Sequence, residues 1–352
     1  MVCHAGPVKT QKLTSVDAFV VRDFPDAPSV GVVRAANKIL PAGAGEMARS
    51  MTYRFALLGM ERGGASAGIN APVGDRLQAV AAFAREVLPE IADGSLMLDP
   101  SGAVDPAAFS AVTDADQRNP IARETVNHAV FADRLLALGA LTAASRAAGG
   151  LEDKMTVIEG FDRHGPTLAA GIAGNGGRIT GVSTPKGAIT STDGFLPADL
   201  NQAWTDHGLD MVEHLGDVQP ANRIFGTPGD VLFVGSKMGV LNHKGAEFVS
   251  AKVVVPTSEV PYTTKAVLAL ERAGTTVLPD FLTTAGQTFA DWADPALTTA
   301  EIEETMMSRL GELTETVLQD PVDMPVIAAA KAAEAFMGTW QENLPFGRPF
   351  AP

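Results

Sequence analysis

Apolar and polar residues alternate with two different periods along the chain, and this difference predicts its elements. Residues 16–24 (VDAFVVRDF) and 29–34 (SVGVVR) show the alternation of half-buried strands. Apolar residues at helical spacing predict three helices, at 42–60, 77–91 and 129–148. A glycine-rich stretch at 63–68 is expected to follow the first helix, and Gly149 and Gly150 are expected to end the third.

Beyond residue 150 the pattern changes to short apolar runs that alternate with helical segments. The predicted strands are 155–159, 178–183, 231–235, 251–255 and 275–278. Helices are predicted from Pro166, at 299–318 and at 326–340. Strands that alternate with helices indicate a parallel sheet covered on both faces, so we expect an α/β fold with a domain boundary at the glycine pair.

Length and charge restrict the possible functions. With 352 residues, 46% of them hydrophobic, the chain is long enough for two domains with large cores. A net charge of −14 argues against nucleic acid or an anionic membrane as partner. No run of about 18 apolar residues predicts a membrane span. We expect a cytoplasmic protein that acts on small molecules.

Disulfide and metal chemistry are not expected. The single cysteine, Cys3, allows neither a disulfide within the chain nor a cysteine-based zinc site, and it favours a reducing compartment. Residues 1–12 lack the apolar stretch of a signal peptide. His207 and His214 are predicted on one helix, about 10 Å apart along its axis, which is too far for one metal ion.

The turn after the strand at 155–159 carries the first candidate chemistry. A glycine-rich turn between a strand and a helix commonly holds a pyrophosphate. Gly160 and Gly165 fit that pattern, but Asp162 stands at the middle glycine's place. A carboxylate about 4 Å from a phosphate costs about 4 kcal/mol at an effective dielectric of 20, which Arg163 and His164 could partly offset. A modified phosphate site and a turn without dinucleotide both remain open.

The next strand ends in polar residues, Ser183, Thr184 and Lys186. The acidic residue that would bind an adenosine ribose about 20 residues after the glycines is missing. These three residues could instead meet the 2′-phosphate of NADP, or they could form an ordinary polar strand end.

Three stretches, in this order and spacing, resemble the Glu/Leu/Phe/Val dehydrogenase family over most of the chain. They lie at 49–69 (RSMTYR…GGASAGI), 179–194 (ITGVSTPKGAITSTDG) and 251–292 (AKVVVPTSEVP…FADW). The resemblance implies two domains and a homo-oligomer. It implies an α/β substrate and oligomerisation domain at 1–149, a Rossmann-type dinucleotide-binding domain at 150–322, and a C-terminal helix at 323–352 that returns to the first domain.

The family's chemistry is the oxidative deamination of amino acids, with hydride passing to NAD(P). The resemblance implies one lysine that holds the substrate carboxylate and a second, twelve residues on, that transfers protons together with an aspartate. Arg54 and Ser66 occupy these places. Arg54 could still hold a carboxylate, or it could be a surface arginine. Ser66 cannot replace an amine base; it could donate a hydrogen bond, act as a nucleophile, or simply be tolerated as a small residue.

Other family positions also differ. The aspartate aligns with Asp99 or Ser101, the substrate-facing arginine is kept as Arg34, and Glu259 replaces an asparagine in the cofactor-facing loop. We therefore predict Arg34 and Arg54 as substrate-binding residues and Ser66, Asp99 and Glu259 as candidate catalytic residues.

These differences predict that the family's reaction is lost and that NAD(P) binding is doubtful. The favoured hypothesis is an enzyme of altered, non-redox chemistry on a small amino-acid-like substrate in the cleft between the domains. One alternative is an NADP-preferring oxidoreductase with a relocated base. Another is a non-catalytic ligand-binding or assembly subunit, because family ancestry alone does not decide function.

Overall fold

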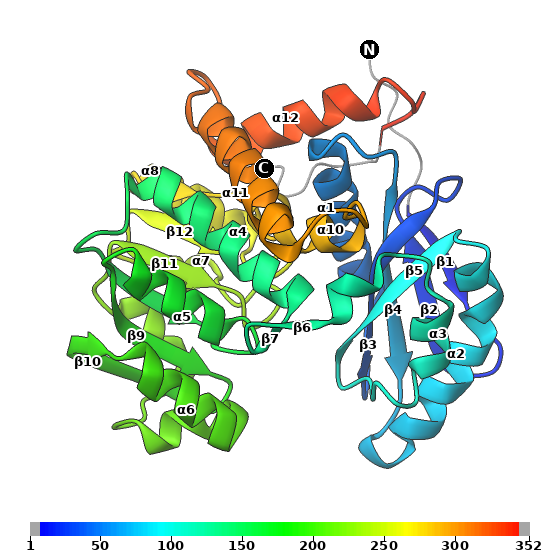
Figure 1. Cartoon of the computed structure of the whole chain (residues 1–352), viewed down its shortest axis with the longest axis horizontal. Coiled ribbons are helices and arrows are strands. Elements are labelled where there is room, and N and C mark those ends of the chain that lie inside the picture. The colour runs from blue at the N-terminus through cyan, green and yellow to red at the C-terminus, as the bar shows by residue number, and fades with distance from the viewer. Residues whose placement is uncertain (1–7, 345–352) are drawn as a thin grey trace. The chain divides into compact units, whose positions relative to one another are not determined.

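The computed structural model describes residues 8–344, which form two compact units (Figure 1). The first unit comprises the described residues up to Arg118 together with those from Ala330, and the second runs from Asn119 to Ala329. The two units meet at residues 118 and 119, about 30 residues before the domain boundary that the sequence predicted after residue 149. The roles predicted for the two domains remain predictions. Cys3 lies outside the described residues.

The described part of the first unit is built on a five-stranded sheet in the order β1-β2-β4-β3-β5. Strand β3 is parallel to β4 and β5, while β2 is antiparallel to β1 and β4. The strands are β1 (Lys9–Lys12), β2 (Ala18–Arg22), β3 (Ser29–Ala36), β4 (Gly63–Asn70) and β5 (Leu96–Gly102). The helices are α1 (Pro41–Leu57), α2 (Arg76–Ala92) and α3 (Ser110–Ala115). The strands expected at 16–24 and 29–34 are confirmed as β2 and β3.

The glycine-rich stretch at 63–68, for which the sequence predicted no strand, forms most of strand β4. Its small residues hide the alternation that marks a strand. They also let α1 pack directly on it, because a Cβ on Gly64 would lie 1.8 Å from the carbonyl oxygen of Ala48 in α1. Only glycine allows that approach of two backbones.

The two faces of this sheet are covered by different helices. On one face, apolar side chains such as Val20, Val33 and Leu98 pack with Phe83 and Val87 of α2. On the other face, Phe19 and Val21 pack with Ala44 and Ala48 of α1. The α1 face of the sheet also carries the polar residues of the candidate site.

The second unit holds a sheet with the order β10-β9-β8-β11-β12-β13. All neighbours are parallel except β10, which runs antiparallel to β9. The strands are β8 (Met155–Glu159), β9 (Arg178–Thr184), β10 (Gly187–Phe195), β11 (Val231–Val234), β12 (Val253–Pro256) and β13 (Thr276–Val277). The five predicted strands are confirmed, and β10 was missed because it follows β9 after only two residues.

Helices accompany this parallel sheet (Figure 1). They are α4 (Phe131–Ala148), α5 (Gly165–Gly174), α6 (Pro197–His207), α7 (His243–Ala246), α8 (Thr264–Arg272), α9 (Asp280–Thr283), α10 (Gly286–Asp291) and α11 (Thr299–Leu318). Strands β6 (Thr125–Val126) and β7 (Ala129–Val130) form a small hairpin before α4, and α12 (Pro325–Met337) is the last helix described. In the hydrophobic core of this unit, Leu141 of α4 and Leu168 of α5 are buried together with Ile158 of β8 and Phe233 of β11.

The expected single helix through His207 and His214 is wrong. Helix α6 ends at His207, and a 3₁₀ helix, η3, continues from Gly208 to His214. Gly208 has a φ of 55°, which breaks the α-helical path. The imidazole rings stack with centroids 3.6 Å apart, not two helical turns apart. Within residues 8–344, no group of three or more His, Cys, Asp or Glu side chains could hold a metal ion.

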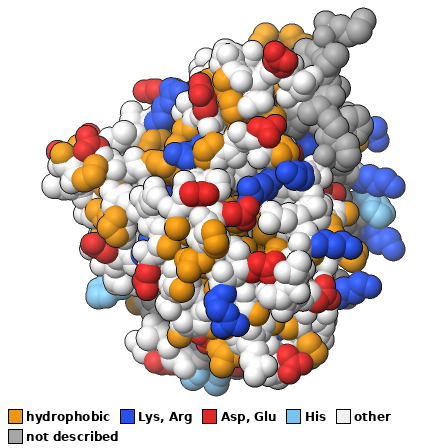
Figure 2. Space-filling view, turned by 90° about the vertical axis from the view of Figure 1, so that its right-hand side faces the viewer, with side chains coloured by type: hydrophobic (Ala, Val, Ile, Leu, Met, Phe, Trp, Pro, Cys, Tyr) orange, Lys and Arg blue, Asp and Glu red, His pale blue; other side chains and the backbone are white. Residues whose placement is uncertain are grey.

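Acidic side chains are scattered among hydrophobic and basic ones on the face shown in Figure 2. Among the described residues, no helix combines the length and the apolar character needed to cross a membrane.

Helix α11 begins with a capping box whose contribution can be measured. The hydroxyl of Thr298 accepts a hydrogen bond from the Glu301 backbone N–H at 3.3 Å, and the Glu301 carboxylate accepts one from the Thr298 backbone N–H at 2.8 Å. We expect Thr298→Ala to lower the free energy of unfolding by about 1 kcal/mol in a urea titration. Thr316→Ala, an exposed position in the same helix, is the control. Equal losses in the two variants would contradict the capping role.

Candidate functional site

Three of the predicted site residues lie on one face of the first unit's sheet. Val32 of β3 pairs with Ser66 of β4 on one side and with Asp99 of β5 on the other. Arg34 stands two residues beyond Val32, so its side chain points to the same face. Its guanidinium Nη2 donates a hydrogen bond of 3.5 Å to the Ser66 hydroxyl. The strand register therefore brings Arg34, Ser66 and Asp99 together.

Helix α1, which packs on this face, carries Arg54. The Arg54 side chain is only 2% exposed, so the surface-arginine alternative is wrong. Ser66 is also fully buried, whereas Arg34 is half-buried. A buried guanidinium is stable only when polar groups or anions compensate its lost hydration.

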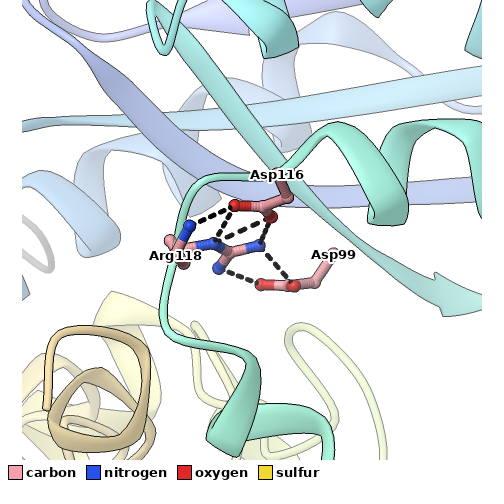
Figure 3. A network of polar contacts seen from close by, with 3 residues as sticks. All are labelled: Asp99, Asp116 and Arg118. Atoms are coloured by element: carbon pink, nitrogen blue, oxygen red, sulfur yellow. Dashed lines mark hydrogen bonds and ion pairs between the residues drawn. The ribbon is translucent and has the colours of Figure 1, made fainter. Parts of the chain in front are cut away.

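Asp99 belongs to an ion network that local sequence patterns did not reveal (Figure 3). The Arg118 guanidinium donates to both carboxylate oxygens of Asp99, at 2.8 and 2.6 Å, and also to Asp116 at 2.6 Å. The side chains of Arg118 and Asp116 are each 1% exposed, while that of Asp99 is 43% exposed. Asp99 is thus an oriented carboxylate with one side open to solvent.

Arg62 is a further cation that sequence reasoning did not single out. Burial, reinforced by the charge of nearby Arg118, lowers the pKa of Arg62. Ser101, the alternative to Asp99, pairs with Arg34 in the register of β3 and β5. Both candidates for the aspartate position therefore adjoin Arg34, and the choice between them stays open.

The turn after β8, predicted as a cofactor site, forms a cluster of four charged side chains. The Asp162 carboxylate accepts a hydrogen bond of 2.9 Å from the backbone N–H of His164, and it lies 3.0 Å from His164 Nδ1. Asp133 of α4 lies 3.2 Å from His164 Nε2 and accepts a bond of 2.8 Å from Arg163. Burial alone would lower the pKa of His164, but the two carboxylates outweigh it and raise that pKa to about 9.

A third carboxylate, Glu159, occupies the end of β8. It is buried and accepts hydrogen bonds from the backbone N–H groups of Gly235 and Ser236, both at 3.1 Å, and from the Ser236 hydroxyl at 2.5 Å. Burial raises the pKa of Glu159, although these hydrogen bonds oppose the shift. The signal in the sequence that could have revealed Glu159 is an acidic residue at the end of a strand that is buried along most of its length.

The residues at the end of β9 that were predicted to meet a 2′-phosphate already have partners within the unit. Ser183 is buried, and its backbone carbonyl oxygen accepts a hydrogen bond of 2.7 Å from the backbone N–H of Phe161. The buried Thr184 donates its hydroxyl to the Leu209 carbonyl at 2.7 Å. Lys186 forms an ion pair of 2.6 Å with Asp210.

Glu259 lies in the loop after β12 and is half-buried. The next residue, Val260, has a φ of 50°, and its N–H donates to the buried Asp280 at 2.8 Å, which fixes the loop. Burial lowers the pKa of Arg163, but the charges of Asp133, Asp162 and Glu259 raise it overall. Glu259 therefore lies close enough to the Asp162 turn to act on its charges.

Comparison with known proteins places these features in a family context. Residues 136–339 match the family described as Glutamate/Leucine/Phenylalanine/Valine dehydrogenase. The NADP-specific glutamate dehydrogenase of Saccharolobus shibatae is 30% identical over 172 residues, 45% of this chain and 39% of that protein. The glutamate dehydrogenase of Aeropyrum pernix is 26% identical over 190 residues, 52% of this chain and 46% of that protein. The matches span less than half the length of these relatives.

Solved structures extend the likeness to nearly the whole chain. The hetero-hexameric glutamate dehydrogenase of Thermus thermophilus, in a leucine-bound form, has a TM-score of 0.76 at 21% identity, covering 94% of this chain and 88% of that one. The L-tryptophan dehydrogenase of Nostoc punctiforme has a TM-score of 0.61 at 16% identity, covering 96% of each chain. These likenesses confirm the predicted two-domain α/β fold with a Rossmann-type domain.

Proposed function

Because this chain belongs to the glutamate/leucine/phenylalanine/valine dehydrogenase family, we propose that it binds a small amino acid through Arg34 and Arg54 without deaminating it by the family's reaction. The observation that carries this proposal is Ser66. At the place where the resemblance implies a proton-transferring lysine, this chain has a fully buried hydroxyl that accepts a hydrogen bond from Arg34.

The side chains on this face suit binding better than proton transfer. A guanidinium stays protonated throughout the physiological range, so Arg34 and Arg54 cannot act as bases. A serine hydroxyl becomes a nucleophile only when a neighbouring base removes its proton. The group that contacts the Ser66 hydroxyl at 3.5 Å is instead a cation that donates to it.

Arg34 and Asp99 carry charges opposite to the two charges of an amino acid. The two residues are diagonal neighbours on the adjacent parallel strands β3 and β5, so their side chains lie on the same face of the sheet. The guanidinium can hold a carboxylate through two parallel hydrogen bonds. The partly exposed Asp99 carboxylate, oriented by Arg118, can receive the ammonium group.

An assembled relative supports a ligand-binding role. The Thermus thermophilus protein is described as a hetero-hexamer solved in a leucine-bound form. In an assembly that contains more than one kind of chain, one chain can bind an amino acid without carrying the family's catalytic lysines. We propose that this chain works within an oligomer, as the sequence resemblance also implies.

A non-redox enzyme, the hypothesis that the sequence favoured, is the second candidate. Glu259 is the observation that favours it, because a half-buried carboxylate held in a constrained loop beside Arg163 could act as a general base. This candidate requires that the chain turn over a small molecule and that Glu259→Gln abolish that turnover.

Removal of the Arg34 charge tests the binding proposal. Arg34→Met should weaken amino-acid binding about 10- to 100-fold, since a hydrogen bond to a charged group contributes about 1.5–3 kcal/mol. The measurement is calorimetric titration of the full chain with the amino acid that binds best. The matched control is Arg309→Met, which removes an exposed arginine of α11 and should leave the affinity unchanged. Equal affinities of the two variants would overturn the assignment.

A further inference from the structure

The second unit has the topology of a nucleotide-binding sheet. From β8 the chain continues to β9 on one side, and β11 lies on the other side of β8. In open α/β sheets, ligands bind at this switch point, in the crevice outside the carboxyl ends of the two strands. In this chain, the side chains at that edge already bind one another.

Asp162 stands where the phosphate of a dinucleotide would accept hydrogen bonds. Its carboxylate accepts the backbone N–H of His164, the residue that precedes the first turn of α5, at 2.9 Å. A bound pyrophosphate uses these N–H groups at the start of the helix. The carboxylate is therefore an anion supplied by the chain itself at the helix terminus.

The cations around this internal anion already have carboxylate partners. Asp162 and Asp133 carry the negative charges, and His164 and Arg163 carry the positive ones. His164 is 7% exposed and contacts one carboxylate with each ring nitrogen. Arg163 and His164, the two cations that the sequence predicted to face a phosphate, are thus already paired with carboxylates.

Glu159 and Gly160 close the crevice beside this turn. The Glu159 carboxylate ties the end of β8 to Gly235 and Ser236, which follow β11. The two loops touch so closely that a Cβ on Gly160 would lie 2.4 Å from the Ser236 backbone nitrogen. On the far side of β8, Lys186 is paired with Asp210.

We infer that the nucleotide crevice of the second unit is closed from within. Asp162 takes the place of the pyrophosphate, and Glu159 bridges the loops that would receive the rest of the dinucleotide. The residues present do not fit NAD(P), and the second unit serves this chain as a scaffold.

Two titrations test this inference. In the first, the wild-type chain is titrated with NADPH by calorimetry, and we expect no saturable heat up to millimolar nucleotide. Saturable binding would overturn the inference. In the second, Asp162→Gly is titrated with inorganic pyrophosphate. Loss of the carboxylate frees the His164 N–H and leaves Arg163 and His164 with one fewer negative neighbour, so this variant should gain saturable binding at least tenfold tighter than that of the wild type.

Asp162→Asn is the matched control. Its amide oxygen can still accept the His164 N–H and fill the turn, so it should gain much less affinity for pyrophosphate than Asp162→Gly. A folded Asp162→Gly variant that gains no affinity would overturn the role assigned to Asp162. The wild-type titration decides the inference even if the glycine variant does not fold. Neither titration depends on amino-acid binding in the first unit, so failure here is distinguishable from failure of the proposed function.

Discussion

Arg118→Ala is expected to lower the free energy of unfolding by about 3–5 kcal/mol, as measured by urea denaturation at neutral pH. The substitution leaves Asp116, whose side chain is 1% exposed, as a buried carboxylate without the guanidinium that now compensates it. Removing the guanidinium from a buried ion pair costs far more than losing an ion pair at the surface.

Two further variants separate burial from simple loss of charge. Arg309→Ala breaks an exposed ion pair with Glu312 and should cost no more than about 1 kcal/mol. The double variant Arg118→Ala/Asp116→Ala removes the buried carboxylate as well, and it should recover part of the loss. An Arg118→Ala variant as stable as Arg309→Ala would contradict the described network.

The stability of the chain is expected to fall between pH 6.5 and pH 9 because of His164. Its pKa is raised from 6.5 to about 9 in the folded state, so the folded chain holds a proton that the unfolded chain releases. The stabilisation is therefore complete below pH 6.5 and is lost as the pH rises through 9. A shift from 6.5 to about 9 corresponds to about 3 kcal/mol.

The measurement is a series of urea titrations at pH 6, 7.5 and 9.5, on the wild type and on His164→Gln. The variant should be less stable at pH 6 and should lose much less stability as the pH rises. His243→Gln, at an exposed histidine, should keep the wild-type dependence. Parallel curves for the wild type and His164→Gln would show that this imidazole is not held as a cation.

The elements that the sequence predicted well are those whose pattern reflects burial. The run that became β11 is wholly apolar, and the run that became β8 is mainly apolar, because both faces of a parallel sheet are covered. Strand β4 escaped prediction because close packing against α1 requires glycine and alanine, which carry no periodic signal. The exposed edge strand β1 has no apolar face to mark it.

The residues of the candidate site that lie on neighbouring strands could be predicted from the sequence. The resemblance singled out Arg34, Ser66 and Asp99, and the parallel strands place them on one face. Their partners were not predictable, because a contact such as that between Asp99 and Arg118 joins residues 19 positions apart without any local pattern. Likewise, Asp133 reaches His164 only through the packing of α4 against α5.

Amino-acid binding is tested by calorimetric titration of the wild-type chain with a panel of amino acids, without nucleotide. We expect saturable heat for at least one amino acid and none for the matching amine that lacks the carboxylate, because Arg34 and Arg54 recognise that group. If no amino acid binds, or if an amine without the carboxylate binds equally well, the proposed carboxylate-binding function is wrong.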